Sequence, residues 1–292
     1  MTKIKGVKIK AFYLIFSLIL SSSILWPQGN DLLLKGQIDW QKGILELNIS
    51  RAFEMSQSFK PHSRFLFESQ VNTRMMDFFL ATVLDLNIDS SHKAIDIIRN
   101  KPGIVEKLKE IAALAQKGYS YYSSNMTMLH IQYQYQLVGE NSLLNCFISH
   151  ENTAVLDKTL GFIPERLFSG IVIYAQGKYP HWGEKYDSSF KPVMFPKIYN
   201  EEMDLLLDPK MCKPEFLEKW GMVAYTSDFN EIPFTLRIGT YPLRTMARGV
   251  FGKTPSDILI PTEDGRRILS NPDNFRLLQE GRILIIIDNV VE

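Results

Sequence analysis

Residues 129–137, LHIQYQYQL, alternate between apolar and polar side chains without interruption. Successive side chains of a β-strand leave opposite faces of the sheet, so this pattern predicts a strand with one apolar face and one polar face. The polar face carries His130, Gln132, Gln134 and Gln136. It is either a self-association surface or a solvated sheet face, and the solvated face is the commoner arrangement in antiparallel sheets.

The residues before this strand predict a hairpin and a long helix. Residues 35–50 alternate on both sides of a Gln-Lys-Gly turn, in which Gly43 is expected to take a positive φ. Residues 64–86 repeat an apolar residue at every fourth position, which predicts one amphipathic helix capped by Ser63. The apolar stripe of this helix either packs in the core or binds a partner.

Shorter elements complete the first half of the chain. Helices are expected over residues 89–100 and 102–118, the second bounded by an initial proline and a final glycine. Residues 143–149, LLNCFIS, predict a strand that forms a hairpin with the alternating strand. Strands grouped on both sides of helices indicate an antiparallel sheet with helices on one face.

The second half contains two short runs of branched apolar residues, residues 169–177 and 281–289. Such runs are typical of interior strands that are buried on both faces, and the second run is expected to be central in its sheet. Between them, residues 213–226 and 262–280 begin with or contain helical patterns, and Thr262 has the character of an N-cap.

Together these patterns predict an α+β fold of two modules, residues 36–150 and 160–292. The first sheet is expected to be mainly antiparallel and the second mainly antiparallel or mixed, with helices packed on one face of each. The chain has 292 residues, of which 45% are hydrophobic and 22% charged, which is an ordinary globular composition and long enough for two small domains.

The first 29 residues have the layout of a secretory signal peptide. Four lysines precede an apolar run, and small residues follow it at Ser21, Ser22 and Ser23. Cleavage is expected after Ser23 or near Gly29. The alternative is an uncleaved membrane anchor, but the apolar stretch is short for a bilayer core of about 30 Å. We therefore expect export to the periplasm or the periphery of the outer membrane.

The charge balance argues against nucleic acid as a partner. The predicted signal peptide holds four of the 33 basic residues and no acidic one, so the remaining chain has 29 basic and 32 acidic residues. Proteins that bind phosphate backbones carry a strongly basic surface, which this balance does not provide. Peripheral association with a membrane remains compatible with it.

Cys146 and Cys212 are the only cysteines of the chain. In an exported protein they either form one disulfide or remain two separate buried thiols. The sequence favours the separate thiols, because Cys146 lies in a predicted apolar strand and Cys212 in a proline-flanked loop.

Motifs that carry chemistry are absent from the sequence. It has no glycine-rich phosphate loop, no G-x-S-x-G elbow and no H-E-x-x-H helix. The five histidines and two cysteines do not have the spacing of a zinc site. We expect no catalytic residue, metal or cofactor, and a hydrolase has no motif to support it.

The aromatic segment KYPHWGEKY offers the most informative candidate site, through Tyr179, His181, Trp182 and Tyr186. Exposed aromatic side chains bury a large area on binding, so this loop is a candidate contact for glycan, lipid headgroups or another protein. The alternative is that Trp182 folds back over the sheet as a lid.

Two acidic groups have simpler explanations. Glu263 and Asp264 stand at a predicted helix start, where the helix dipole stabilises carboxylates without a catalytic role. Glu201, Glu202 and Asp204 form a cluster that either binds a cation or is a solvated turn. The solvated turn is the commoner case.

Five segments in order carry a resemblance to a known family: SGIVIYAQG, KPVMFPKIYNEE, EKWGMVAYTSD, TPSDILIPTEDGRRI and GRILIIID. With IDWQKGILE in the first half, they resemble the exported bacterial envelope family that includes an antigenic membrane-associated lipoprotein and flagellar basal-disk proteins of the outer membrane. The chain departs from that pattern in lacking a lipobox cysteine and in an apparent insertion at residues 178–190.

This resemblance implies an envelope location and a role in assembly or adhesion, and it implies no chemistry. We therefore expect a secreted, non-catalytic structural protein that assembles with itself or with protein partners, possible flagellar components included. The alternative is a periplasmic module that binds a small ligand or glycan, with the loop 179–186 as its lip and an apolar pocket beneath it.

Overall fold

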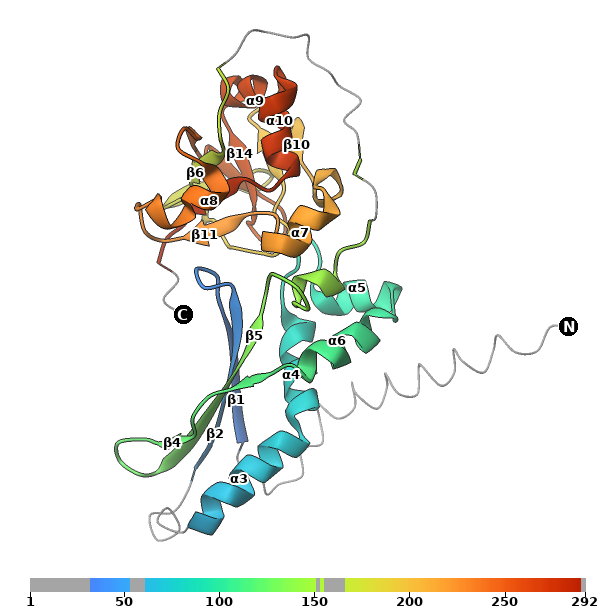
Figure 1. Cartoon of the computed structure of the whole chain (residues 1–292). Helices are drawn as coiled ribbons and strands as arrows, with labels where there is room; N and C mark the ends of the chain where they lie inside the picture. The colour runs from blue at the N-terminus through green and yellow to red at the C-terminus, as the bar shows by residue number, and fades with distance from the viewer. Residues whose placement is uncertain (1–31, 53–60, 151–152, 155–165, 290–292) are drawn as a thin grey trace, which may run out of the picture.

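The computed structural model describes residues 32–52, 61–150, 153–154 and 166–289. The predicted signal peptide, residues 1–29, lies outside the described residues. The described chain forms an elongated first module that meets a rounder second module at one end (Figure 1).

An antiparallel sheet is the scaffold of the first module. The hairpin β1 (Leu32–Asp39) and β2 (Ile44–Ala52) pairs through β2 with β5 (Met128–Gln136), and the short strands β3 (Gln116–Lys117) and β4 (Tyr121–Tyr122) continue beyond it. Gly43 has a φ of 66° in the hairpin turn, as predicted. The apolar side chains of β5 are buried, which confirms the alternation found in the sequence.

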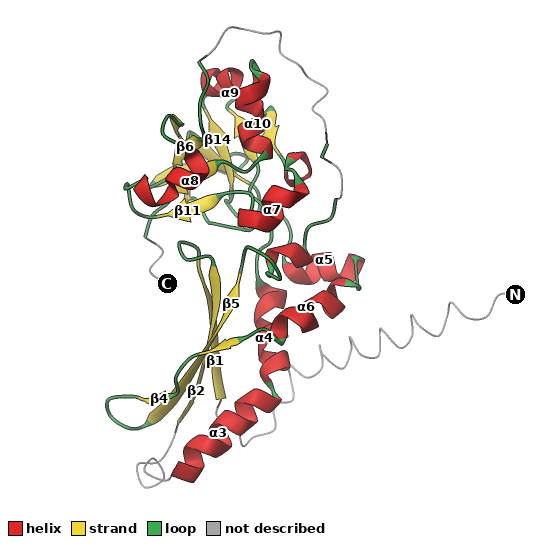
Figure 2. Ribbon diagram, viewed as in Figure 1, coloured by secondary structure: helices red, strands yellow, loops and turns green. Residues whose placement is uncertain are grey.

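Helices cover the apolar face of this sheet (Figure 2). They are α3 (Pro61–Thr73) and α4 (Met75–Asp85), and α5 (Ala94–Asn100) and α6 (Ile104–Ala112) pack against α4. The Phe79 ring lies 4.5 Å from the Tyr135 ring, measured between centroids, and the Tyr133 hydroxyl donates a 2.6 Å hydrogen bond to Asn72 Oδ1. These contacts fix the helices on the sheet.

The prediction of one helix over residues 64–86 is wrong in its continuity. Arg74 separates α3 from α4 with φ −105° and ψ 9°, although Phe67, Val71 and Val83 are all buried as the apolar stripe requires. The stripe therefore identified the buried face correctly, but it cannot reveal a single residue that leaves helical geometry within it. The helix begins at Pro61, so Ser63 is not its N-cap.

Residues 143–149 do not form the predicted strand. Leu144–Cys146 are a short 3-10 helix, and Leu143 and Phe147 beside it are buried with Leu144 and Cys146. Burial at spacings of one, three and four residues fits a helical turn, whereas a half-buried strand would alternate. The partner of β5 is instead the N-terminal hairpin. The helix expected over 102–118 ends at Ala112, and β3 takes its last residues.

The second module contains two four-stranded sheets. One is parallel throughout, in the order β11 (Ala224–Thr226), β15 (Ile283–Ile286), β6 (Ile171–Tyr174) and β12 (Leu243–Met246). The other is mixed, in the order β10 (Leu205–Leu207), β9 (Ile198–Asn200), β14 (Asp257–Ile260) and β13 (Gly249–Phe251). A hairpin of β7 (Lys178–Pro180) and β8 (Asp187–Ser189) adjoins them.

Helices α7 (Pro214–Trp220), α8 (Thr235–Ile238), α9 (Thr262–Leu269) and α10 (Pro272–Gln279) surround the strands. Thr262 is the first residue of α9 rather than its N-cap, because Pro261 holds that position. Both interior strands predicted from the sequence are buried on two faces, and β15 is central in its sheet as expected. The two-module α+β fold is thereby confirmed.

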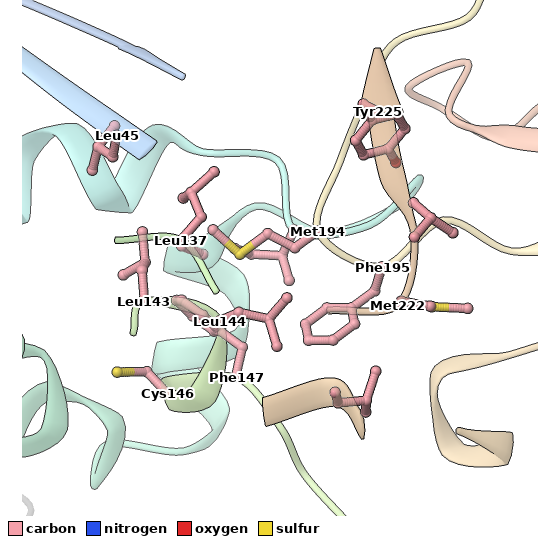
Figure 3. Close-up of a cluster of buried hydrophobic side chains, with 14 of the residues drawn as sticks. Leu45, Leu137, Leu143, Leu144, Cys146, Phe147, Met194, Phe195, Met222 and Tyr225 are labelled. Atoms are coloured by element: carbon pink, nitrogen blue, oxygen red, sulfur yellow. The ribbon is translucent and has the colours of Figure 1, made fainter. Parts of the chain in front are cut away.

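One hydrophobic core runs through both modules. The same cluster of buried side chains includes residues of β2 and β5 and residues of the parallel sheet of the second module. At the junction, Leu137, Leu144 and Phe147 of the first module lie beside Met194, Phe195 and Met222 of the second (Figure 3). The modules therefore pack on each other through buried apolar side chains, as the parts of a single domain do.

Backbone hydrogen bonds reinforce the junction. The Phe195 amide donates to the Ile88 carbonyl at 3.0 Å, and the Gly139 amide donates to the Glu218 carbonyl at 3.0 Å. The Trp40 ring, from the hairpin turn of the first module, meets the Tyr225 ring edge-on with 5.3 Å between centroids.

Candidate functional site

A concave site lies at the carboxyl ends of two parallel strands. It is a cleft of about 680 Å³ bordered by the ends of β6 and β12 and by the start of α9. Ligands of open α/β sheets commonly bind at this edge, because the strands end there and the loops that follow them diverge. The lining residues are Tyr174, Gln176, Tyr179, Phe229, Arg244, Thr245, Met246, Arg248, Pro261 and Asp264.

A fixed network of three side chains forms one wall. Arg244 makes a two-pronged contact with Glu231, through Nε to Oε1 at 3.0 Å and Nη2 to Oε2 at 2.7 Å. The Tyr174 hydroxyl donates to the same carboxylate at 3.1 Å. The hydrogen bond from Arg244 lowers the pKa of Glu231, while burial raises the pKa of Tyr174. The carboxylate is therefore held ionised and orients both neighbours.

A second polar contact of the cleft joins β12 to α9. The buried Thr245 donates its hydroxyl hydrogen to Asp264 Oδ2 at 2.6 Å, which ties the end of β12 to the first turn of α9. Asp264 Oδ1 lies 3.5 Å from Arg267 Nη1. Arg248 is more weakly engaged, since its Nε lies 4.0 Å from Glu201 Oε1.

Aromatic rings supply the apolar part of the cleft. The Tyr174 and Phe229 rings are stacked with 6.2 Å between centroids and 27° between planes, and Phe229 is 64% exposed. Tyr179 is held in place because its hydroxyl donates to the Gln176 carbonyl at 2.7 Å. The exposed side chain of Met246 extends this surface.

The four residues of the predicted aromatic loop have different surroundings, although the His181 and Tyr186 rings meet edge-on with 5.4 Å between centroids. Tyr179 lines the cleft, whereas His181 is buried: its Nε2 donates to the Gly252 carbonyl at 2.9 Å and its Nδ1 lies 3.2 Å from Ser188 Oγ. Trp182 and Tyr186 reach the surface, with exposed fractions of 40% and 58%. His181 therefore has a structural position, and the binding role predicted for the loop stays a prediction.

Trp182 packs against β13, the strand that begins directly after the cleft residue Arg248. Its amide donates to the Val250 carbonyl at 2.9 Å, and a Cβ placed on Gly249 would lie 2.8 Å from the Trp182 ring. The ring therefore rests directly on glycine backbone, with its outer part exposed. This arrangement has features of both alternatives, the folded-back lid and the exposed contact.

The predicted self-association face of β5 is partly engaged within the sheet. The His130 ring stacks on Tyr121 with 5.1 Å between centroids, and Gln134 Nε2 donates to Glu46 Oε1 at 3.1 Å. His130, Gln132 and Gln134 are half-buried, and Gln136 is exposed. Self-association through this face stays a prediction.

The acidic residues are satisfied within the protein. Asn200 Oδ1 accepts hydrogen bonds from the amides of Glu202 and Asp204, which fixes the turn. Glu202 lies 3.7 Å from Arg266, and Glu263 lies 3.4 Å from Arg267. These pairs are exposed and resemble ordinary surface ion pairs.

The two cysteines are separate buried thiols. Burial raises the pKa of Cys146 to about 11 and that of Cys212 to about 12, so neither is a thiolate at neutral pH. Within the described part of the chain, no three His, Cys, Asp or Glu side chains are grouped to hold a metal ion.

The lining of the cleft combines fixed polar side chains with aromatic rings. Its lining includes no serine, cysteine or histidine, and Glu231 is fixed as an anion by Arg244. A general acid needs a raised pKa, which is the opposite of what this pairing produces. The arrangement provides fixed donors, acceptors and aromatic faces.

The sequence singles out Tyr179 as an aromatic loop residue and Asp264 separately as a carboxylate at a helix start. It does not single out Tyr174, Phe229, Arg244 or Arg248, which line the same cleft. The segment 243–248 does alternate, with Leu243, Thr245 and Ala247 buried and the residues between them exposed. That alternation indicates that Arg244, Met246 and Arg248 face outward. It does not indicate that β6 lies beside β12, so the sequence does not reveal that Tyr174 lies near these residues.

None of the helices in the described ranges has the length and apolar character needed to cross a membrane.

Comparison with known proteins assigns each half of the chain. Residues 32–142 match the family model described as the N-terminal domain of Treponema pallidum Tp0624, and residues 170–289 match the model for the second domain of the same protein. A search of curated proteins found no match. The chain is thus similar, over two successive regions and in the same order, to the N-terminal and second domains of a spirochaete protein family.

Proposed function

We propose that this protein is an exported, non-catalytic component of the bacterial cell envelope that acts by assembly with protein partners or with itself. The observation that carries the proposal is the hydrophobic core shared by both modules. A shared core makes a stiff two-module unit, and a stiff unit can hold partners at a fixed separation. The elongated first module, which projects from the junction, suits such a spacer role (Figure 1).

Two further observations support an envelope role. The first 29 residues have the layout of a signal peptide, and the similarity to domains of a spirochaete protein fits a bacterial envelope protein in general terms. The resemblance to flagellar basal-disk and membrane-associated envelope proteins narrows this to the periplasm or the outer-membrane periphery, with flagellar structures as one candidate assembly.

A second candidate function is the binding of a small ligand or glycan. The cleft at the ends of β6 and β12 favours it, because its volume of about 680 Å³ lies within the usual range of small-molecule sites, roughly 300–1,000 Å³. The two functions are compatible, since an envelope component can bind a ligand and still assemble.

Export is tested by fractionating cells that produce the full chain and measuring the mass of the recovered protein. The proposal expects a periplasmic or envelope-bound species shortened by about the length of the predicted signal peptide. Soluble cytosolic protein that retains the intact leader would overturn it.

Assembly is tested by crosslinking in intact cells, followed by identification of the crosslinked species. The proposal expects discrete homo-oligomers or a reproducible set of envelope proteins, and only monomer at every crosslinker concentration would count against it. A variant with Gln134→Arg, on the polar face of β5, tests whether that face is the contact; exposed Arg99→Ala on α5 serves as a control.

A further inference from the structure

The charges around the cleft are balanced. Arg244 faces Glu231, Asp264 lies near Arg267, and Arg248 has a distant partner in Glu201. A site for a strongly anionic ligand would present cations without counter-charges, and a site for a cation would present unpaired carboxylates. The balance favours an uncharged ligand that both donates and accepts hydrogen bonds.

The polar side chains of the cleft retain hydrogen-bond donors and acceptors that are available to an uncharged ligand. The Arg244 Nη1 group is not used in the contacts with Glu231, which engage Nε and Nη2. Gln176 uses its Nε2 group on the Ile287 carbonyl, which leaves its amide oxygen as an acceptor. Guanidinium, amide and carboxylate groups each have two neighbouring polar atoms, which match the spacing of adjacent hydroxyl groups on a ring.

The aromatic side chains supply flat apolar faces beside these polar groups. Phe229 is well exposed and is held parallel to Tyr174, whose hydroxyl is fixed by Glu231. Such pre-positioned rings bury area on binding with little loss of side-chain entropy. The hydrogens on one face of a pyranose ring form an apolar surface that fits an aromatic ring, while the hydroxyl groups at its edge remain polar.

We infer that this cleft is a saccharide-binding site for uncharged oligosaccharides, with Phe229 and Tyr174 as the stacking platform and with Arg244, Arg248, Gln176 and Asp264 as the hydrogen-bonding edge. The inference rests on the proposed non-catalytic binding role and specifies its ligand class. The inference rests on the combination of a charge-balanced polar edge with an aromatic platform at one strand end. No single residue is sufficient for it.

The test measures the binding of chitotetraose, cellotetraose and maltotetraose to the full-length mature protein by calorimetry. Phe229→Ala removes a ring of the stacking platform, and Arg248→Ala removes a donor of the hydrogen-bonding edge. Their matched controls are Phe65→Ala, an equally exposed phenylalanine of the first module (69% against 64%), and Arg276→Ala, an arginine of α10 with a similarly exposed side chain (55% against 56%).

The inference expects at least one of the three oligosaccharides to bind. Phe229→Ala and Arg248→Ala should each weaken binding about fivefold to tenfold, the loss expected for one stacking or hydrogen-bonding contact, while the two controls leave it unchanged. Absence of binding by all three at millimolar concentration overturns the inference, as does binding that neither cleft variant weakens.

Two added measurements keep this test separate from the proposed function. The first is the binding of inorganic phosphate. If phosphate binds and the sugars do not, and Arg248→Ala abolishes phosphate binding, the cleft is an anion site and the saccharide inference is overturned. Mass spectrometry of the oligosaccharide after incubation reports on chemistry: an intact sugar supports binding alone, whereas a cleaved sugar keeps the saccharide site and overturns the non-catalytic role. Failure of export or assembly does not change either readout.

Discussion

Arg237 carries its guanidinium group into the interior of the second module, where backbone carbonyl groups take the place of a carboxylate. Nε donates to Gly281 at 2.7 Å, Nη1 to Trp220 at 2.7 Å and Nη2 to Gly221 at 2.8 Å. The Trp220 ring lies 5.4 Å from the guanidinium carbon. Burial lowers the pKa of Arg237 to about 9, so the group remains charged at neutral pH and ties α8, α7 and the turn before β15 together.

Arg237→Met should therefore destabilise the protein by about 3 kcal/mol or more, because three carbonyl groups lose a charged donor in a dry environment. Urea denaturation measures the change, with the exposed Arg276→Met as the control. A loss below about 1 kcal/mol would show that water replaces the guanidinium at this site.

Asp257 makes stability depend on pH in an unusual direction. It is 1% exposed, and burial raises its pKa to about 6, although it accepts a hydrogen bond from the Lys197 amide at 2.9 Å and one from Ser90. Because the folded-state pKa exceeds the ordinary aspartate pKa of 3.8, the folded protein binds the proton more tightly, and this contribution to stability is lost as pH rises from about 4 to about 6.

Asp257→Asn should flatten this part of the stability curve. The parent protein should lose up to about 3 kcal/mol from this group between pH 4 and pH 7, whereas the variant should not. Denaturation midpoints across this range measure the effect. Glu68, whose pKa is lowered to about 2, contributes stability that is lost below about pH 4.5, so it acts in a different window. Equal slopes in parent and variant between pH 4 and pH 6 would contradict the assignment.

At the scale of elements, the strands and their faces were the most predictable features. The alternation of β5 and the branched apolar run of β15 each identified a strand and its burial, because a strand side chain has only two directions to point. The break at Arg74 and the turn Leu144–Cys146 were not predictable, since their apolar residues fit more than one geometry until the neighbouring elements are in place.

The same limit applies to the candidate site. Tyr179 and Asp264 attracted notice as an aromatic residue in a loop and an acid at a helix start, but Phe229 and Arg244 belong to segments that look ordinary. They become a site only because β12 pairs with β6 in parallel, and the sequence pattern does not state which strands are neighbours.

Strand β6 begins at a point of very close approach. A Cβ on Gly170 would lie 2.4 Å from the Ile238 carbonyl oxygen at the end of α8, which is backbone that cannot rotate away. Gly170→Ala should therefore destabilise the second module by about 1–3 kcal/mol, as overpacking does elsewhere. Thermal denaturation tests this against Gly103→Ala, where the added Cβ meets nothing within 4 Å. A variant as stable as its control would mean that α8 shifts without cost.

At the scale of the whole molecule, the two modules are expected to unfold as one cooperative unit. Proteins with separate domains usually unfold in more than one step, because few contacts cross the boundary. Here Phe195 of the second module is buried against residues of the first, and its amide bonds to the Ile88 carbonyl. The junction is thus built like a core.

Native-state hydrogen exchange in increasing urea tests this claim most directly, with the amides of Tyr133 in β5 and Ile285 in β15 as reporters of the two modules. If the modules are cooperative, both amides open with the same free energy, and Phe195→Ala lowers both opening free energies together by about 3–5 kcal/mol. Separate opening energies, with the Phe195→Ala effect confined to the second module, would contradict it.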